Sequence, residues 1–306
     1  MLVAGLENPA YRLRRSIQQN YPRNRGITEK LKSVLTKEEP IWYVFITVQY
    51  GERMKKSTYS APSVQKAFKI LHAIADSSSG LGVSELAKQL KIGKSTVHGI
   101  TSSLEELGVL VRDPIDKRYN VGYTLLELGR KTYGKIKWRE IARGPMERLM
   151  DKVGETIFLG IMNGDHITIL DVVESHNEMK ITSPPGTRLP LLAGATGKAF
   201  LSLLDEKMAK EIIRKVGLIR FTSRSVTDPK KFLKEVEEAK QRGYAFDDEE
   251  YLIGVRAISA PIPMSSPPPA AIWAVGFTSS LNDQKMEMVI QEIQKTAREI
   301  SHAIKF

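Results

Sequence analysis

Cysteine is absent from the 306 residues, and long hydrophobic runs are scarce. Without cysteine the chain forms neither a disulfide nor a thiolate zinc site, which fits a reducing compartment. The run "IWYVFITV" at 41–48 is far shorter than the ~20 residues that a membrane span requires, and no small-residue cleavage site follows it. We therefore expect a cytoplasmic protein without a membrane segment.

Acidic residues are fewer than basic ones, and the difference is distributed unevenly along the chain. The formal net charge is +11, and such an excess suggests a nucleic-acid partner. Residues 1–59 contain eleven Lys and Arg against five Asp and Glu, whereas residues 60–130 contain nine against seven. More than half of the excess therefore lies in the first 59 residues, and the total charge is weak support for DNA binding.

Those first residues also lack a periodic apolar pattern. The segment "YRLRRSIQQNYPRNRG" is basic and aperiodic, and Gly51-Glu52-Arg53 stands directly before Met54. An all-purine stretch can encode these three residues, as in a ribosome-binding site ahead of a start codon. We expect residues 1–59 to be a disordered extension or a start assigned too far upstream, with the true start at Met54. A basic arm that binds DNA or a partner is the alternative.

Three helical patterns and a hairpin follow. The first, "SVQKAFKILHAIADS", begins at the potential cap Ser63 and carries Val64 and Phe68 on its apolar stripe. The second and third, "VSELAKQLK" and "KSTVHGITSSLEEL", are joined by a turn containing Gly93. Two helices joined in this way are typical of a helix-turn-helix. The alternating runs of "VLVRDPIDKRYNVG" predict a β-hairpin, which is the wing of a winged helix.

The first turns of the third helix present side chains that suit DNA. A recognition helix reaches base edges with these turns, and its free N–H groups favour a phosphate. Short polar side chains are expected to bond base edges, and the cations, two of them in the wing, to neutralise phosphates. Ordinary helix capping by the hydroxyls is the alternative. The predicted DNA-binding residues are Ser84, Lys94, Ser95, Thr96, His98, Ser102, Lys117 and Arg118.

A longer helical pattern beginning at Tyr123 leads into a region of mixed helices and strands. A turn at Asn163-Gly164-Asp165 predicts a hairpin. Helices are expected near 139–153, 196–204, 206–216 and 229–242, and further strands near 257–262 and 271–277. A sheet covered by helices, with a core of its own, follows from this pattern.

The stretch "AGATGKAF" has some features of a phosphate-binding loop. The Walker pattern requires a further glycine and a hydroxyl after its lysine, where this chain has Leu192 and Ala199. We therefore reject a nucleotidase. Backbone N–H groups at Gly194 and Ala195 could instead meet a small anion at the start of the following helix. A tight turn that packs this helix on the sheet is the alternative.

No catalytic or metal site stands out. The acid run "DDEE" at 247–250 offers hard-metal ligands but lacks EF-hand spacing, and a solvated loop is the simpler interpretation. The five histidines are scattered, and no nucleophile, base and orienting acid occur together. We predict no cofactor, no metal and no enzyme activity. An enzyme on the larger domain, with the winged helix as a docking module, remains the alternative.

Taken in order, several stretches resemble the IclR family of bacterial transcriptional regulators. They are "SVQKAFKILHAI", "VSELAKQLKIGKSTVHGITSSLEELGVL", "RYNVGYTLLELG", "GTRLPLLAGATGKAFLS" and "EEAKQRGYAFDDEEYLIGVRAISAPI". The resemblance covers most of the chain from Ser60 on. It implies an α+β chain with a winged helix-turn-helix domain at 60–123, a linker helix at 124–138, and an α/β effector-binding domain with a curved antiparallel sheet at 139–306.

The same resemblance implies a sequence-specific DNA-binding regulator controlled by a small molecule, acting as a homodimer or homotetramer on a palindromic double-stranded operator. The implied effector-binding residues are Gly194, Ala195, Asp247, Ala257, Ala274 and Gly276. The family often has arginine at Gly99, so one DNA contact of the family is missing here. It often has cysteine at Ala257 and hydroxyl residues at Ala274 and Gly276. Because these three polar groups are missing from the implied pocket, an organic acid with an aromatic or partly apolar body is favoured over a small hydrated one. A structural nucleic-acid binder without a pocket is a further rival.

Overall fold

The computed structural model describes residues 61–134, 136–264 and 268–304, so the extension expected at 1–59 lies outside the described residues. Two compact units are present, and the division between them falls at Lys137 and Trp138. No helix within the described ranges is both long and apolar enough to cross a membrane.

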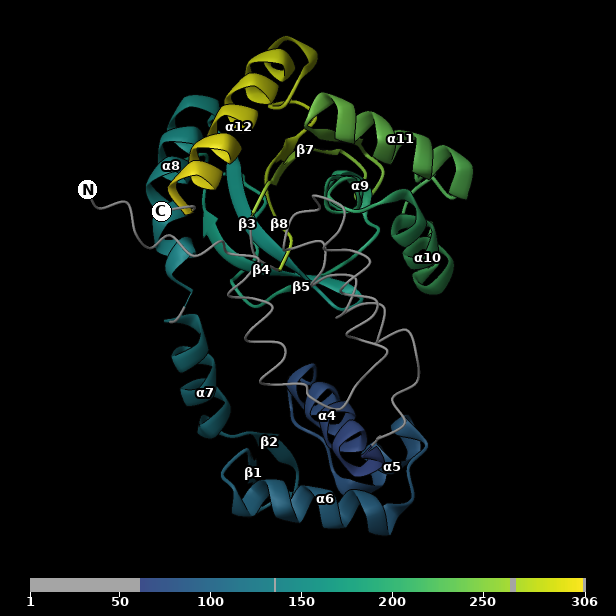
Figure 1. Ribbon diagram of the computed structural model, residues 1–306. Helices are drawn as coiled ribbons and strands as arrows, with labels where there is room; N and C mark the ends of the chain where they lie inside the picture. Colours follow the sequence, from purple (N-terminus) through teal and green to yellow (C-terminus); the bar gives the residue numbers. More distant parts are fainter. Residues whose placement is uncertain (1–60, 135, 265–267, 305–306) are drawn as a thin grey trace, which may run out of the picture. The chain divides into compact units, whose positions relative to one another are not determined.

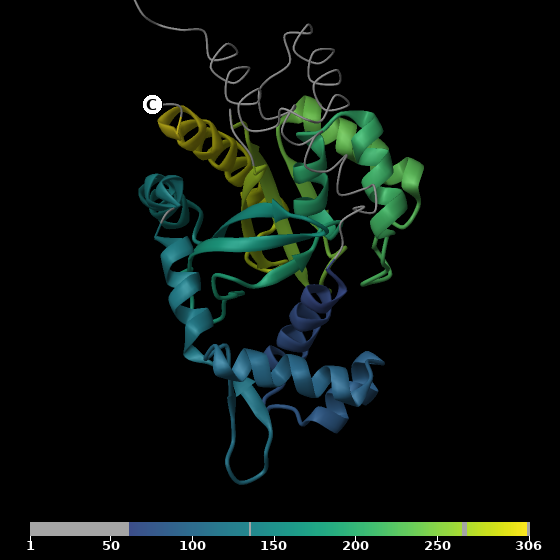
Figure 2. The same cartoon turned by 60° about the horizontal axis from the view of Figure 1, so that its bottom comes forward.

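The smaller unit is a winged helix, as predicted. Its elements are α4 (Pro62–Ala75), α5 (Val83–Leu90), α6 (Lys94–Glu106), β1 (Leu110–Arg112), β2 (Tyr119–Val121) and α7 (Tyr123–Tyr133). Leu86, Val97 and Tyr119 are fully buried in its core, and β1 pairs with β2 in an antiparallel hairpin. Figure 2 shows this hairpin as a long loop projecting from the helices.

Helix α4 presents a different face to the core from the one expected. It begins at Pro62 after the cap residue Ala61, so Ser63 is not its cap. Val64 and Phe68 are 54% and 60% exposed, while Ile70 is fully buried. The apolar stripe of α4 is wide enough for either Val64 and Phe68 or Ile70 to face the core. Within the described residues, Val64 and Phe68 on the first two turns are exposed to solvent.

The larger unit is one antiparallel sheet between helices. Its strands are β3 (Thr156–Asn163), β4 (His166–Val173), β5 (Arg188–Pro190), β6 (Ala245–Asp248), β7 (Val255–Ile262) and β8 (Ala270–Phe277). Its helices are α8 (Lys137–Val153), α9 (Gly194–Ser202), α10 (Glu206–Val216), α11 (Pro229–Arg242) and α12 (Asp283–Ile304). The strand order β5-β4-β3-β8-β7-β6 gives a curved sheet, with α9, α10 and α11 over one face and α8 and α12 over the other (Figures 1 and 2).

The register between β7 and β8 decides which side chains face α9. Ala257 pairs with Val275, and Ile258 pairs with Ala274. Because side chains alternate along a strand, Ala257 and Val275 share one face, whereas Ala274 lies on the other. Ala257 and Val275 both pack with the alanines of α9, so theirs is the face that α9 covers.

The expectation that Ala274 and Gly276 line a pocket with Ala257 is therefore wrong. Gly276 lies on the opposite face, where an added Cβ would be 2.4 Å from Glu155 Oε2. If a strand is aligned with its family one residue out of register, every side chain is assigned to the wrong face of the sheet. Trp273 and Val275 occupy the expected positions instead.

Candidate DNA-binding surface and effector site

Helix α6 is anchored by its buried side and exposes its first turn. Val97 and Thr101 are completely buried, and the Thr101 hydroxyl donates to the carbonyls of Val97 and His98. The cap residue is Gly93, which has no side chain to satisfy the helix N–H groups. Capping by Ser95 or Thr96 is therefore not what the structure shows, and the free N–H groups at this end favour a phosphate.

The predicted DNA-reading side chains lie on the outer side of α5 and α6. Ser84, Lys94, Ser95 and His98 are exposed, and Thr96 is half-buried. His98 Nδ1 lies 3.4 Å from Ser102 Oγ, one helical turn later, which orients the ring. Apart from this pair, these side chains have no hydrogen-bond partner among residues 61–134, so their polar groups are available to a ligand.

The two wing cations differ from each other. Arg118 donates to the carbonyl of Gly80 at 2.8 Å and to Glu85 Oε1 at 2.5 Å. The Lys117 ammonium, at a residue with φ 61°, donates to the carbonyl of Pro114 at 2.7 Å and forms no ion pair within the described residues. A neutral carbonyl leaves the charge of Lys117 uncompensated, whereas a carboxylate compensates that of Arg118. Of the two, Lys117 is the better placed to attract a phosphate.

In the larger unit, the start of α9 meets the edge strand β6. Gly194 has φ +46°, and a Cβ there would be 1.9 Å from Asp247 Oδ2. Only glycine permits this approach of carboxylate to backbone. Ala195 and Ala257 are buried beside it, at 1% and 8% exposure. The structure thus brings four of the six predicted effector-binding residues together.

Asp247 is the chemically unusual member of this group. Its side chain is 5% exposed, and Oδ1 accepts a hydrogen bond of 2.6 Å from the Glu250 amide. Burial raises the pKa of Asp247 to about 6; the neighbouring Glu250 charge adds to the rise, and Lys198 opposes it. A carboxyl that titrates near neutrality can accept or donate a hydrogen bond, depending on what lies beside it.

Lys198, which follows the two glycines of "AGATGKAF", takes part in an internal ion-pair network. It is 3% exposed and lies 2.6 Å from Glu235 Oε2 on α11 and 2.5 Å from Glu250 Oε1. Burial raises the pKa of Glu250, against the effect of Lys198. A lysine held by two carboxylates is not available to a nucleotide phosphate, which agrees with rejecting the Walker interpretation.

A stacked pair of aromatic rings, Phe158 and Trp273, lies on the face of the sheet that α9 covers; we call this pair the aromatic floor. Trp273 is 3% exposed and stacks on Phe158, with ring centroids 5.6 Å apart and planes at 11°. A Cβ on Gly160 would be 2.7 Å from the indole ring, so this glycine makes room for it. Neither Trp273 nor Glu235 was predicted, because only the strand register and the packing of α11 reveal them.

The two remaining acids of "DDEE", Asp248 and Glu249, form ion pairs with two arginines. Asp248 Oδ2 lies 2.6 Å from Arg224, Asp248 Oδ1 lies 2.7 Å from Arg256, and Glu249 lies 3.2 Å from Arg224. Across the described ranges, no group of three or more His, Cys, Asp or Glu side chains could hold a metal ion. The acid run is thus a set of ion pairs around one buried carboxyl.

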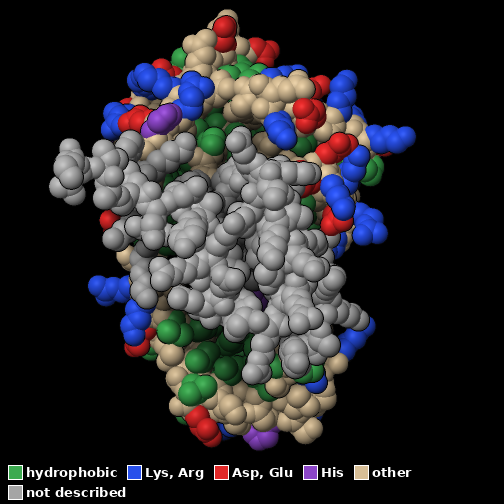
Figure 3. Space-filling model, viewed as in Figure 1, with side chains coloured by type: hydrophobic (Ala, Val, Ile, Leu, Met, Phe, Trp, Pro, Cys, Tyr) green, Lys and Arg blue, Asp and Glu red, His purple; other side chains and the backbone are tan. Residues whose placement is uncertain are grey.

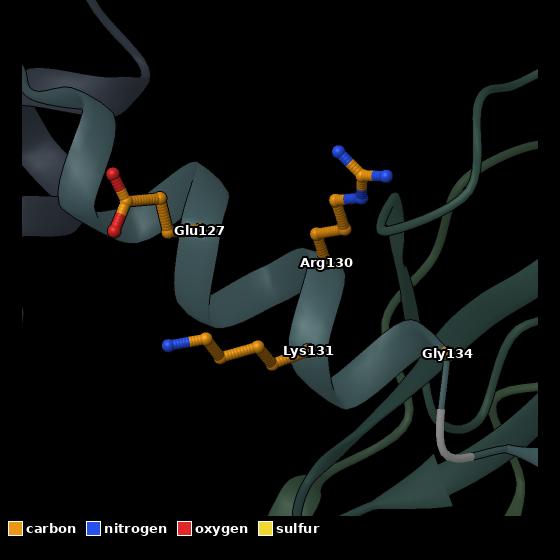
Figure 4. Close-up of a pocket in the computed structure, with 4 residues that line it drawn as sticks. All are labelled: Glu127, Arg130, Lys131 and Gly134. Atoms are coloured by element: carbon orange, nitrogen blue, oxygen red, sulfur yellow. The ribbon is translucent and has the colours of Figure 1, made fainter.

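A surface hollow on α7 brings no such chemistry together. Its lining includes Glu127, Arg130, Lys131 and Gly134. Figure 4 shows Glu127 and Lys131 extending from one side of the helix and Arg130 from another, so the three long side chains do not converge. The hollow is an ordinary solvated helix surface.

Comparisons with known proteins match both units. The "IclR helix-turn-helix domain" matches residues 63–114, and "Bacterial transcriptional regulator IclR C-terminal" matches residues 131–302. The HTH-type transcriptional regulator BhcR of Paracoccus denitrificans is 35% identical over 240 residues, which cover 78% of this chain and 86% of BhcR. The Transcriptional repressor IclR of Escherichia coli is 27% identical, over 81% of this chain and 91% of that protein.

Solved structures agree. The crystal structure of the IclR protein of Thermotoga maritima is 30% identical, covers 80% of this chain and 99% of its own, and has a TM-score of 0.60. An IclR homolog from Microbacterium hydrocarbonoxydans, crystallised with 4-hydroxybenzoate, has a TM-score of 0.66 at 22% identity, over 79% of this chain and 99% of its own. The second likeness shows a shared fold only.

Proposed function

This chain belongs to the IclR family of bacterial transcriptional regulators, and from that premise we propose that it acts as a homodimer on a palindromic operator and responds to an aromatic carboxylate. DNA binding by the winged helix and small-molecule control through the C-terminal domain follow from the family itself. Beyond the family, we propose the homodimer, the palindromic operator, the aromatic effector, and action in the cytoplasm, where bacterial DNA lies.

The observation that carries the DNA half is the uncapped start of α6, with exposed Lys94, Ser95 and His98. Short side chains there allow close approach to base edges, and a good specific contact is worth ~1–3 kcal/mol. Replacing Thr96 or His98 should relax base preference, whereas replacing Lys117 should weaken all sequences alike. Footprinting on a duplex selected from a random pool separates the two effects, and identical behaviour of both sets would remove the recognition-helix assignment.

A dimer is supported by apolar surface on the smaller unit. No residue of α7 is buried, and its Tyr123 and Leu126 are 79% and 69% exposed, while Val64 and Phe68 of α4 are also in solvent. Figure 3 shows hydrophobic side chains gathered on the visible face of this unit. Two linked modules bind a palindrome far more tightly than one. Light scattering should show a dimer or a tetramer that Phe68→Glu and Leu126→Glu dissociate.

The effector half is supported by the surroundings of Asp247. Trp273, Val275 and Ala257 offer apolar contacts on the sheet, with no hydroxyl for a small hydrated acid, whose unpaired polar atoms would each cost ~1–3 kcal/mol. The ligand carboxylate would meet the N–H groups at Gly194, and its body the apolar side chains. Since two bare carboxylates repel, Asp247 would then be protonated or would bond a ligand hydroxyl.

Calorimetry or thermal-shift screening with benzoate and hydroxybenzoates beside glyoxylate and pyruvate tests this class. Tight binding of the two-carbon and three-carbon acids, with no response to any aromatic acid, would refute it. We propose no catalytic role, because the relatives are regulators. An enzyme with a docking module would instead consume a ligand, which chromatography of the incubated mixture would detect.

A further inference from the structure

Arg118 is held more firmly than an exposed wing residue normally is. Its guanidinium donates to the Gly80 carbonyl at 2.8 Å, to Ser79 Oγ at 3.4 Å and to Glu85 Oε1 at 2.5 Å. These groups lie at the loop before α5 and on α5 itself. The side chain of Arg118 is 30% exposed, so it lies along the protein rather than extending into solvent.

Glu85 completes the link to α5. Its Oε2 accepts from the Gly82 amide at 2.8 Å and so caps the helix, while Oε1 accepts from Arg118. A single carboxylate thereby joins the start of α5 to the wing residue that directly precedes strand β2. Helix α5 packs on the recognition helix α6, so the pair ties the wing to the helix-turn-helix.

The backbone fixes the same junction. Leu81 and Tyr119 exchange two N–H to carbonyl bonds of 3.1 and 3.0 Å. Gly80 has φ +68°, and a Cβ there would be 2.6 Å from the Tyr119 carbonyl, so the two segments touch closely. An exposed ion pair alone contributes only ~0.2–1 kcal/mol to stability. Here the ion pair lies beside the paired backbone of Leu81 and Tyr119, at the point where the wing loop enters β2.

We propose that Glu85 and Arg118 are positioning residues for DNA binding, which hold the wing so that Lys117 reaches a backbone phosphate. Lys117 immediately precedes Arg118 and the anchored strand β2, and the turn before it is fixed by Asp113, whose Oδ1 accepts from the Ile115 amide at 2.7 Å. The carboxylate of Glu85 should then strengthen binding to DNA, although both are negatively charged. If Glu85 acted only through its charge, its carboxylate would weaken DNA binding.

The test combines Glu85→Gln with Lys117→Ala in a double-mutant cycle on the full chain. Glutamine keeps an acceptor for the Gly82 amide but loses the ion pair. Affinity is measured against a duplex selected with the unaltered protein and against a random 30-base-pair duplex, over a range of salt. Glu105→Gln is the matched control, because Glu105 is exposed and its carboxylate forms no ion pair or hydrogen bond within the described residues.

Each single variant should weaken binding about three- to tenfold and lower the salt slope by about one. The double variant should bind no more weakly than Lys117→Ala alone, since both changes remove the same phosphate contact. Arg118→Lys, which keeps the charge, should behave like Glu85→Gln. Glu105→Gln should bind at least as tightly as the unaltered protein.

The proposal is overturned if Glu85→Gln binds as tightly as Glu105→Gln, or if Lys117→Ala causes its full loss in the Glu85→Gln background. Circular dichroism accompanies every measurement. An unfolded winged helix in Glu85→Gln would make the pair a stability element only and would equally overturn the positioning role. None of these results depends on the identity of the effector.

Discussion

Asp247→Asn should remove a pH dependence from the stability of the larger unit. A folded-state pKa of about 6 against an ordinary value of 3.8 corresponds to about 3 kcal/mol. Since the pKa is raised, the folded protein holds this proton more firmly than the unfolded chain. The contribution is complete below pH ~3.8 and is lost as the pH rises to about 6 and beyond.

Asparagine is nearly isosteric, stays neutral, and its carbonyl can still accept from the Glu250 amide. The variant and the unaltered protein should therefore be similarly stable near pH 4, and the variant should be more stable by up to about 3 kcal/mol at pH 7. Urea unfolding between pH 4 and 7.5 measures the difference. Asp248→Asn is the control, because it breaks ion pairs with Arg224 and Arg256 and should lose stability at pH 7. Parallel curves for Asp247→Asn and the unaltered protein would refute the reasoning.

Substitutions at three further positions have expected outcomes. Gly99→Ala should stabilise the winged helix by ~1 kcal/mol in thermal unfolding, because a Cβ there meets nothing within 4 Å. Gly99→Arg should tighten DNA binding and steepen its dependence on salt concentration, because it adds a cation on the recognition helix. Lys198→Met should destabilise the larger unit by ~3–5 kcal/mol in thermal unfolding, since Glu235 and Glu250 would lose a buried partner. Trp273→Ala should cost ~3–5 kcal/mol by the same measurement, and a loss below 1 kcal/mol would show that the aromatic floor does not pack as described.

Local chemistry is what made much of the fold predictable from the sequence. Helices α10 and α11 occupy the predicted ranges, because Asp205 and Asp228 cap their N-termini. The two carboxylates accept hydrogen bonds from the amides of Met208 and Lys231. The winged helix followed from apolar spacing and from the turn at Gly93. Signals of this kind lie within a few residues of the structure that they determine.

Long-range pairing was the part that could not be predicted. Strand β6 was missed, because "AFDD" carries two acids and no clear alternation, and only its pairing with β7 makes it a strand. Arg118 was expected to meet a phosphate, since nothing near it in sequence identifies Glu85, 33 residues away, as its partner. The predicted DNA-binding set therefore contained a residue whose charge the fold already compensates.

The strand register changes which side chains line the proposed effector site, but it leaves the place of that site in the fold unchanged. With Ala274 and Gly276 facing α9, the site would have been enlarged by two small residues. With Trp273 and Val275 there instead, the same face is apolar and filled. Both arrangements disfavour a small hydrated acid, but only the second limits the room for an aromatic one. The proposed ligand would then lie toward Gly194 and Asp247, at the start of α9, beside a buried carboxyl whose pKa burial raises to about 6.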